Sequence, residues 1–260
     1  MNVIDSFSLE NKVALVTGGA GLYGRQIVAA LAEAGAETYI ASRNLQALKK
    51  VEAEHCSLGH NVKALQVDQG DENSILALRE EIRKRSGRLD VLVNNSVARP
   101  MNGYQNNVSA FAESMKINAT GLFIITRAMG DFIAERTGGS IINIGSIYGM
   151  TGPDPTNYIG TAMQSWSPDY YFHKGGMINF TRFIASYYGN KGIRCNCINP
   201  GGLYQPTMPD AFIKNYNSRT FLGRLANETD LKGIIVFLAS DASVYITGTN
   251  IPVDGGYTAK

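Results

Sequence analysis

Short apolar runs alternate along this chain with longer segments in which apolar residues recur at helical spacing. The runs predict strands at 12–16, 38–41, 62–67, 89–94, 140–144, 193–198 and 250–253. The segments between them predict helices at 24–34, 45–56, 71–86, 110–136, 170–189 and 229–240. Buried strands separated by amphipathic helices are typical of a parallel sheet that is covered on both faces. We therefore predict an α/β fold, a doubly wound, Rossmann-type parallel sheet of seven strands with helices on both faces.

The pattern contains no linker, composition break or repeat, so we expect residues 1–260 to form one domain. Two segments interrupt the alternation, and each follows the end of a predicted strand. Residues 147–169, with three prolines, are expected to be an inserted substrate loop. Residues 202–218 are expected to be a lid over the substrate. Open α/β sheets bind ligands at this edge, where long loops often control access and specificity.

The composition narrows the possible function classes. The chain has 24 Lys and Arg against 22 Asp and Glu, a formal charge of +2, so we expect no nucleic-acid or membrane partner. Cys195 and Cys197 alternate within one predicted strand and are expected to be buried free thiols. The three histidines lack metal-ligand spacing, so we expect no metal. The N-terminal segment is polar and no window is long enough to span a bilayer, which favours a cytoplasmic protein.

A glycine-rich turn joins the first predicted strand to the first helix. It comprises Thr17, Gly18, Gly19, Gly21, Leu22, Tyr23 and Gly24. Glycines let the backbone approach a pyrophosphate, whose charge then meets the amide groups of a helix N-terminus. This position between strand and helix predicts a dinucleotide site, although an ordinary glycine-rich turn is an alternative.

The end of the second strand suggests which dinucleotide binds. NAD sites usually offer a carboxylate here, whereas NADP sites offer a cation to the 2′-phosphate. This chain has Ser42 and Arg43 and no acidic residue nearby, so we predict NADP as the preferred cofactor and NAD as the alternative. A solvated Arg43 at a helix start is the other interpretation. Short polar residues at the next two strand ends are expected beside the cofactor, namely Asp68, Gln69, Asn94, Asn95 and Ser96.

Tyr170 and Lys174 lie four residues apart on a predicted helix, downstream of Ser146. Residues at this spacing share a helix face, where an ammonium can make a phenol more acidic. A phenol activated in this way suits proton transfer to or from an oxygen-bearing carbon during hydride transfer. Taken singly, these residues could also be a core aromatic, a surface cation and a strand-end cap.

The glycine turn, the polar strand ends, Ser146 and the pair Tyr170 and Lys174 follow one another along the chain, with Asn118, Asn199-Pro200-Gly201 and the tail 246–256. This ordered set of motifs resembles the short-chain dehydrogenase/reductase superfamily over nearly the whole chain. The resemblance implies that Tyr170 exchanges the proton and that Lys174 holds the nicotinamide ribose. It also implies that Ser146 orients the reacting oxygen and that Asn118 holds a water of a proton relay. Further implied contacts are Pro200, Gly201 and Leu203 to the nicotinamide, and Ser146, Tyr148, Tyr158 and Gly202 to the substrate.

The chain departs from the superfamily pattern in three places. Leu22 stands where a glycine is common, and Gly21 takes its role. Gln205 stands about where many members have a threonine. Ser146 and Tyr170 are 24 positions apart, and Tyr158, which is nearer the usual place, has Ala162 four residues later instead of a lysine. We therefore assign the catalytic role to Tyr170.

The spacing of 24 positions between Ser146 and Tyr170, and the residues around Tyr170, resemble particular members of the superfamily. These members are flagellin-modification oxidoreductases of nonulosonate pathways and gluconate 5-dehydrogenases, so the resemblance implies a sugar, sugar acid or polyol substrate. The inserted loop offers hydrogen bonds and an aromatic face through Thr156, Asn157, Tyr158, Thr161, Gln164, Ser165 and Trp166. The alternatives are a polar surface loop, a ketoreductase for lipid-like or aromatic carbonyls, and a catalytically silent dinucleotide-binding redox sensor.

The two longest predicted helices, 110–136 and 170–189, carry apolar residues around much of their circumference. A helix of this kind is buried on more than one side. In the family it resembles, the second side forms a subunit interface, so we expect a homotetramer or homodimer.

Overall fold

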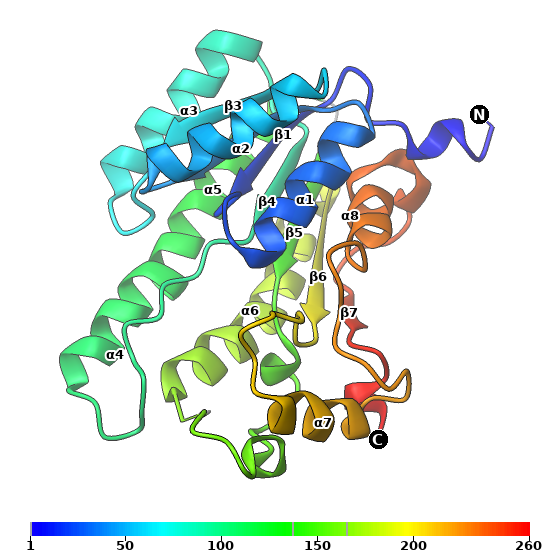
Figure 1. Ribbon diagram of the computed structural model, residues 1–260. Coiled ribbons are helices and arrows are strands. Elements are labelled where there is room, and N and C mark those ends of the chain that lie inside the picture. Colours follow the sequence, from blue (N-terminus) through cyan, green and yellow to red (C-terminus); the bar gives the residue numbers. More distant parts are fainter. Residues whose placement is uncertain (1, 137, 165) are drawn as a thin grey trace.

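The computed structural model describes residues 2–136, 138–164 and 166–260. Its centre is a seven-stranded sheet in the order β3-β2-β1-β4-β5-β6-β7, with every neighbouring pair parallel. The strands are β1 (Val13–Thr17), β2 (Glu37–Ser42), β3 (Val62–Gln66), β4 (Val91–Asn94), β5 (Gly139–Ile144), β6 (Ile193–Pro200) and β7 (Asn250–Val253). The predicted fold class is confirmed (Figure 1).

Helices cover both faces of the sheet because successive residues of each buried strand point to opposite sides. In β1, Ala14 and Val16 pack with α1 (Leu22–Glu33), α2 (Leu45–Ser57) and α8 (Lys232–Ala239). Val13 and Leu15 pack on the other face with α3 (Glu72–Ser86), α5 (Leu122–Ala134) and α6 (Pro168–Tyr188). The two layers are visible on either side of the strands in Figure 1.

The segment predicted as helical at 110–136 is helical at 108–134, but it is not a uniform α-helix. It consists of α4 (Val108–Met115), a π-helix at Lys116–Gly121, and α5. Gly121 lies so close to the loop after β3 that a Cβ there would be 2.1 Å from the carbonyl oxygen of Gln69. The wider π turn therefore coincides with close packing of this helix against the loop that follows β3.

The segment predicted as a lid contains a helix that we did not predict, α7 (Asp210–Arg219). Only Phe212 and Tyr216, four residues apart, are buried along it. They pack with Tyr158 and Tyr257, so this helix depends on contacts with distant segments rather than on a strong local pattern.

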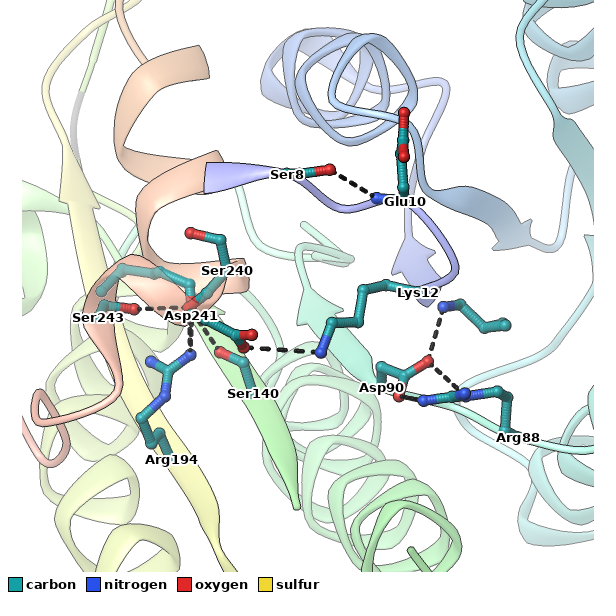
Figure 2. A network of polar contacts seen from close by, with 12 residues as sticks. Ser8, Glu10, Lys12, Arg88, Asp90, Ser140, Arg194, Ser240, Asp241 and Ser243 are labelled. Atoms are coloured by element: carbon teal, nitrogen blue, oxygen red, sulfur yellow. Dashed lines mark hydrogen bonds and ion pairs between the residues drawn. The ribbon is translucent and has the colours of Figure 1, made fainter. Parts of the chain in front are cut away.

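A polar network connects the strands at their amino-terminal edge, opposite the expected ligand edge (Figure 2). The buried Asp90 carboxylate accepts hydrogen bonds from the backbone N–H of Val13 at 2.8 Å and from Arg88 Nε at 2.9 Å. Lys12 pairs with Asp241 at 3.6 Å. These contacts join the start of β1 to the segments before β4 and after α8.

Cys195 and Cys197 are buried and unpaired, as predicted. None of the helices in the described ranges is long and apolar enough to cross a membrane. Across the same ranges, no group of three or more His, Cys, Asp or Glu side chains could hold a metal ion.

Candidate active site

A cavity of about 1000 Å³ lies at the carboxyl-terminal edge of the sheet. Most of the site residues predicted from the sequence line it. They are Gly18, Gly21, Leu22, Tyr23, Ser42, Arg43, Asp68, Gln69, Asn95, Ser96, Ser146, Tyr148, Tyr158, Tyr170, Lys174, Pro200, Gly201, Gly202 and Leu203. Five others are not part of its wall: Thr17, Gly19, Gly24, Asn94 and Asn118.

The glycine turn lies between β1 and the first turn of α1. Gly18 has φ +69°, a value that favours glycine, and a Cβ on Gly24 would lie 2.2 Å from the Gly18 carbonyl oxygen. A Cβ on Gly19 would come within 2.9 Å of Ile40. Gly19 and Gly24 thus permit close packing of the turn. The amino end of α1 forms part of the cavity wall. This arrangement fits the phosphates of a dinucleotide.

Thr17 and Asn94 support the cavity wall from behind. Thr17 Oγ1 accepts hydrogen bonds from the backbone N–H groups of Asn95 and Ser96, both at 3.0 Å. Asn94 Nδ2 donates to Asn143 Oδ1 at 2.9 Å inside the sheet. These bonds fix the loop after β4 beside the glycine turn, so both residues position the site without lining it.

The end of β2 forms one end of the cavity. Arg43 is exposed, and its carbonyl accepts a hydrogen bond from Gln66 Nε2 at 3.1 Å. Its guanidinium group forms no hydrogen bond or ion pair within the described part of the chain. Asp68 and Gln69 line the same end, and Gln69 Nε2 is bonded to the carbonyl oxygen of Ile117 at 3.1 Å. An unpaired cation therefore lies where the second strand meets the cavity.

Tyr170 and Lys174 lie together at the other end. The Lys174 ammonium is 5.7 Å from the centre of the Tyr170 ring, and Tyr170 is half-buried in the cavity wall. Lys174 is only 3% exposed, and its Nζ donates to the Ile144 carbonyl oxygen at 2.5 Å. Burial lowers the pKa of Lys174, while Tyr170 and Cys197 counteract that effect. The two predicted partners thus share one helix face, as their spacing requires.

Ser146 lies two residues after β5, whose last residue, Ile144, accepts the hydrogen bond of Lys174. Its backbone N–H donates to Asn199 Oδ1 at 3.1 Å, and its hydroxyl oxygen accepts from the N–H of Tyr148 at 3.2 Å. The Ser146 hydroxyl donates to no acceptor within the described residues, so its proton remains available to a ligand oxygen.

Asn118 lies in the π-helix, and its side chain makes three hydrogen bonds within the protein. Its Nδ2 donates to the Ala98 carbonyl at 2.8 Å and to Ser114 Oγ at 2.9 Å, and its Oδ1 accepts from the Ala98 N–H at 2.8 Å. Ser114 in turn donates to the buried carboxylate of Asp169 at 2.6 Å. Both amide hydrogens of Asn118 are thus used, so a water at this residue would be held by acceptor atoms, the backbone carbonyl among them.

The sequence reasoning missed two residues around Tyr170. The guanidinium carbon of Arg99, in the loop after β4, lies 4.7 Å from the Tyr170 ring centre. His173 packs edge-on against the same ring, with centroids 5.3 Å apart. Burial, reinforced by Lys174 and Arg99, lowers the pKa of His173 to about 3, so the imidazole is neutral at physiological pH. The sequence did contain a signal for Arg99: it follows the strand predicted at 89–94, at the ligand edge, and has no acidic neighbour.

The two segments predicted as substrate loop and lid both line the cavity and contact each other. The hydroxyls of Tyr148 and Tyr158 are hydrogen-bonded at 2.8 Å, and Tyr158 packs on Phe212 of α7 with centroids 5.5 Å apart. Burial and the neighbouring Tyr158 raise the pKa of Tyr148, which therefore stays a neutral hydroxyl.

Of the loop residues expected to contact substrate, Tyr158 and Gln164 line the cavity. Thr156, Asn157, Thr161 and Trp166 are not part of its wall, and Ser165 lies outside the described residues. Thr156 Oγ1 bonds Asp154 at 2.6 Å, and Asn157 Nδ2 bonds the Tyr257 hydroxyl at 2.6 Å. Part of this loop is thus held by the protein itself rather than presented to a ligand.

Comparison with known proteins agrees with this geometry. A family model described as enoyl-(acyl carrier protein) reductase matches residues 21–258. The chain is 31% identical to a 2-dehydro-3-deoxy-D-gluconate 5-dehydrogenase of Pseudoalteromonas atlantica, over 99% of this chain and 100% of that protein. It is 30% identical to a 7alpha-hydroxysteroid dehydrogenase of Bacteroides fragilis, over 96% and 95%. The fold and the cavity thus define a nucleotide-dependent dehydrogenase or reductase.

A solved structure gives the same result. The gluconate 5-dehydrogenase of Burkholderia cenocepacia, in complex with NADP and tartrate, superposes with a TM-score of 0.89 at 26% identity, covering 100% of both chains. The chain belongs to the short-chain dehydrogenase/reductase superfamily and is an NAD(P)-dependent oxidoreductase.

Proposed function

We propose that this enzyme interconverts a secondary alcohol and a ketone on a sugar, sugar acid or polyol. The observation that carries the proposal is the position of Tyr170 in the cavity wall, 5.7 Å from the ammonium of a buried Lys174. A bound nicotinamide cofactor supplies the hydride in reduction and accepts it in oxidation. The Tyr170 hydroxyl gives its proton to the carbonyl oxygen in reduction, and the phenolate takes one from the alcohol in oxidation.

The neighbouring residues support this proton transfer. The Ser146 hydroxyl, whose oxygen is held by the Tyr148 N–H, donates to the reacting oxygen. Lys174 favours the phenolate and reaches the ribose, while the backbone of Asn118 holds the relay water. Pro200, Gly201 and Leu203 line the space for the nicotinamide ring.

Polar aromatic groups at the substrate end favour a hydroxylated substrate. The linked hydroxyls of Tyr148 and Tyr158, with Gln164 and Gly202, provide donors and acceptors next to ring faces. The sugar-acid dehydrogenases among its relatives support the same class. A second candidate is a bulky apolar carbonyl compound, favoured by Phe212 and Tyr216 in the wall and by the hydroxysteroid dehydrogenase relative.

The proposal extends to cofactor, domain organisation, assembly and location. The unpaired Arg43 favours NADP through its 2′-phosphate. We propose one domain over 1–260, with residues 147–169 as substrate loop and 202–218 as lid, in a cytoplasmic enzyme.

Stacked aromatic side chains on α6 support a homotetramer or homodimer, because Phe183 is 57% exposed while it stacks on Phe180 and Tyr187.

The test is a panel of sugars, sugar acids, polyols, hydroxysteroids and aromatic ketones, followed by the absorbance of the reduced cofactor. We expect turnover with a hydroxylated substrate and a loss of about 10²–10⁴-fold in kcat for Tyr170→Phe. Tyr187→Phe, on the exposed side of the same helix, is the control. Full activity of Tyr170→Phe would overturn the catalytic assignment, and turnover confined to steroids or aromatic ketones would favour the second candidate.

A further inference from the structure

Arg99 has an unusual position among the arginines of this chain. In the described ranges, only Arg43, Arg99 and Arg182 have guanidinium groups with neither a hydrogen bond nor an ion pair. Arg43 and Arg99 both line the cavity, at its two ends, whereas Arg182 is exposed on α6 outside it. An unpaired guanidinium inside a ligand cavity is available to bind an anion.

No carboxylate of the cavity wall neutralises Arg99. The acidic residues in that wall are Asp68, at the Arg43 end, and Asp169. Asp169 is 1% exposed, and one of its oxygens accepts a hydrogen bond from Ser114 rather than from Arg99. Lys174, whose ammonium lies against the same Tyr170 ring, adds to the positive charge at this end. A substrate with a negative group would therefore complete the charge balance.

From this placement, we propose that Arg99 binds a carboxylate of the substrate, so that the enzyme acts on hydroxy or keto acids. This inference rests on the proposed function and deepens it. The planar fork of arginine matches the two oxygens of a carboxylate. Ring contact with Tyr170 holds the guanidinium beside the group that exchanges the proton.

The position of Arg99 also limits the length of the acid. The guanidinium carbon is 4.7 Å from the centre of the Tyr170 ring, so the carboxylate and the reacting carbon lie beside the same side chain. This proximity favours an acid in which only a few carbon–carbon bonds, each about 1.5 Å long, separate the two groups. Short-chain hydroxy acids and sugar acids satisfy this spacing.

The test measures binding separately from turnover. Calorimetry is carried out on the full-length enzyme saturated with NADP, with L-tartrate as the acidic probe and erythritol as its neutral four-carbon counterpart. We expect tartrate to bind more tightly than erythritol, and Arg99→Gln to weaken tartrate about 10–100-fold, as for loss of a charge-assisted contact. Arg99→Lys keeps the positive charge but loses the planar two-donor geometry, so its affinity for tartrate should lie between those of the wild type and Arg99→Gln. Arg182→Gln is the matched control, because it removes an equally unpaired guanidinium outside the cavity.

Three results would overturn the proposal: no tartrate binding to the wild type, equal tartrate affinity in wild type and Arg99→Gln, or an equal loss in Arg182→Gln. Turnover distinguishes this failure from failure of the proposed function. If neutral polyols are oxidised and acids are not, the proposed function stands and the carboxylate subsite is wrong. If no alcohol reacts, the proposed function fails, and tartrate binding still decides the role of Arg99.

Discussion

Replacing Lys174 by methionine should stabilise the protein while it removes activity. Lys174 is 3% exposed, and its one hydrogen bond within the described residues goes to the Ile144 carbonyl oxygen. It takes part in none of the ion pairs between those residues. Burying an ammonium in this way costs several kcal/mol, and a charge-assisted hydrogen bond returns only about 1.5–3 kcal/mol. Methionine keeps the volume without the charge, so we expect a net gain of about 1–2 kcal/mol.

The pH dependence of this gain has a definite sign. Burial lowers the pKa of Lys174 below its ordinary value of 10.5. Between the lowered pKa and 10.5, the unfolded chain binds a proton that the folded protein holds less strongly, so the wild type gains stability as pH rises. Methionine does not titrate. The advantage of Lys174→Met is therefore largest near neutral pH and disappears above about pH 10.5.

The assay is urea unfolding of the cofactor-free protein at one protomer concentration, at about pH 7 and about pH 10. Lys50→Met, on the exposed side of α2, is the matched control and should change the free energy of unfolding by less than about 0.5 kcal/mol. The kcat of Lys174→Met should fall about 10²–10⁴-fold. A variant less stable than the wild type near neutral pH, or a gain that grows with pH, would refute the reasoning.

Three further changes test other parts of the structure. Arg43→Gln should weaken NADP binding about 10–100-fold and NAD binding far less, measured by fluorescence titration, and equal losses would contradict a 2′-phosphate contact. Phe183→Glu places a charge on the exposed aromatic stack of α6 and should lower the mass measured by light scattering, whereas an unchanged mass would place the interface elsewhere. Asp90→Ala removes the acceptor of the Val13 N–H and the partner of Arg88, so urea unfolding should show a loss of about 2–4 kcal/mol, and a loss below about 1 kcal/mol would contradict its role.

The sequence was sufficient for the sheet because its signal is local. Apolar runs such as the one at β1 are buried on both faces in any parallel sheet, and the prediction follows from burial alone. The break at Lys116–Gly121 could not be read in the same way, because Gly121 meets the loop after β3, far away in sequence. Helix α7 was missed for a similar reason, since its buried Phe212 and Tyr216 need partners from the inserted loop and the C-terminus.

The same distinction applies to the candidate site: contacts set by local spacing were predictable, and contacts between distant segments were not. The spacing of Tyr170 and Lys174 fixes a shared helix face wherever the helix packs, so their proximity was predictable. The approach of Arg99 to Tyr170 joins a loop after β4 to a helix some seventy positions later, and no local pattern encodes that contact. The hydrogen bonds of the Asn118 amide to Ala98 and Ser114 were not predictable either, because the Ala98 contact joins the loop after β4 to the π-helix.

Segment 147–169 and helix α7, which are separate in the sequence, are joined by polar contacts. Asp154 of the inserted loop forms an ion pair with Arg219 at the end of α7, and Asn215 of α7 donates to the Ile159 carbonyl at 2.9 Å. Helix α7 also contacts the segment after β6, because the Gly202 N–H donates to the Tyr216 hydroxyl at 2.6 Å.

The glycine turn is connected to the same loop. Tyr23 donates its hydroxyl proton to the Gly201 carbonyl at 2.8 Å, so Gly201 and Gly202 are held from both sides, by the turn and by α7. A displacement of α7 would therefore either break the Tyr216 contact or carry residues 201–202 with it. In the second case the hydrogen bond between Tyr23 and Gly201 would be displaced as well. The glycine turn and α7 are thus connected through the peptide bond between Gly201 and Gly202, with one hydrogen bond on each side of it.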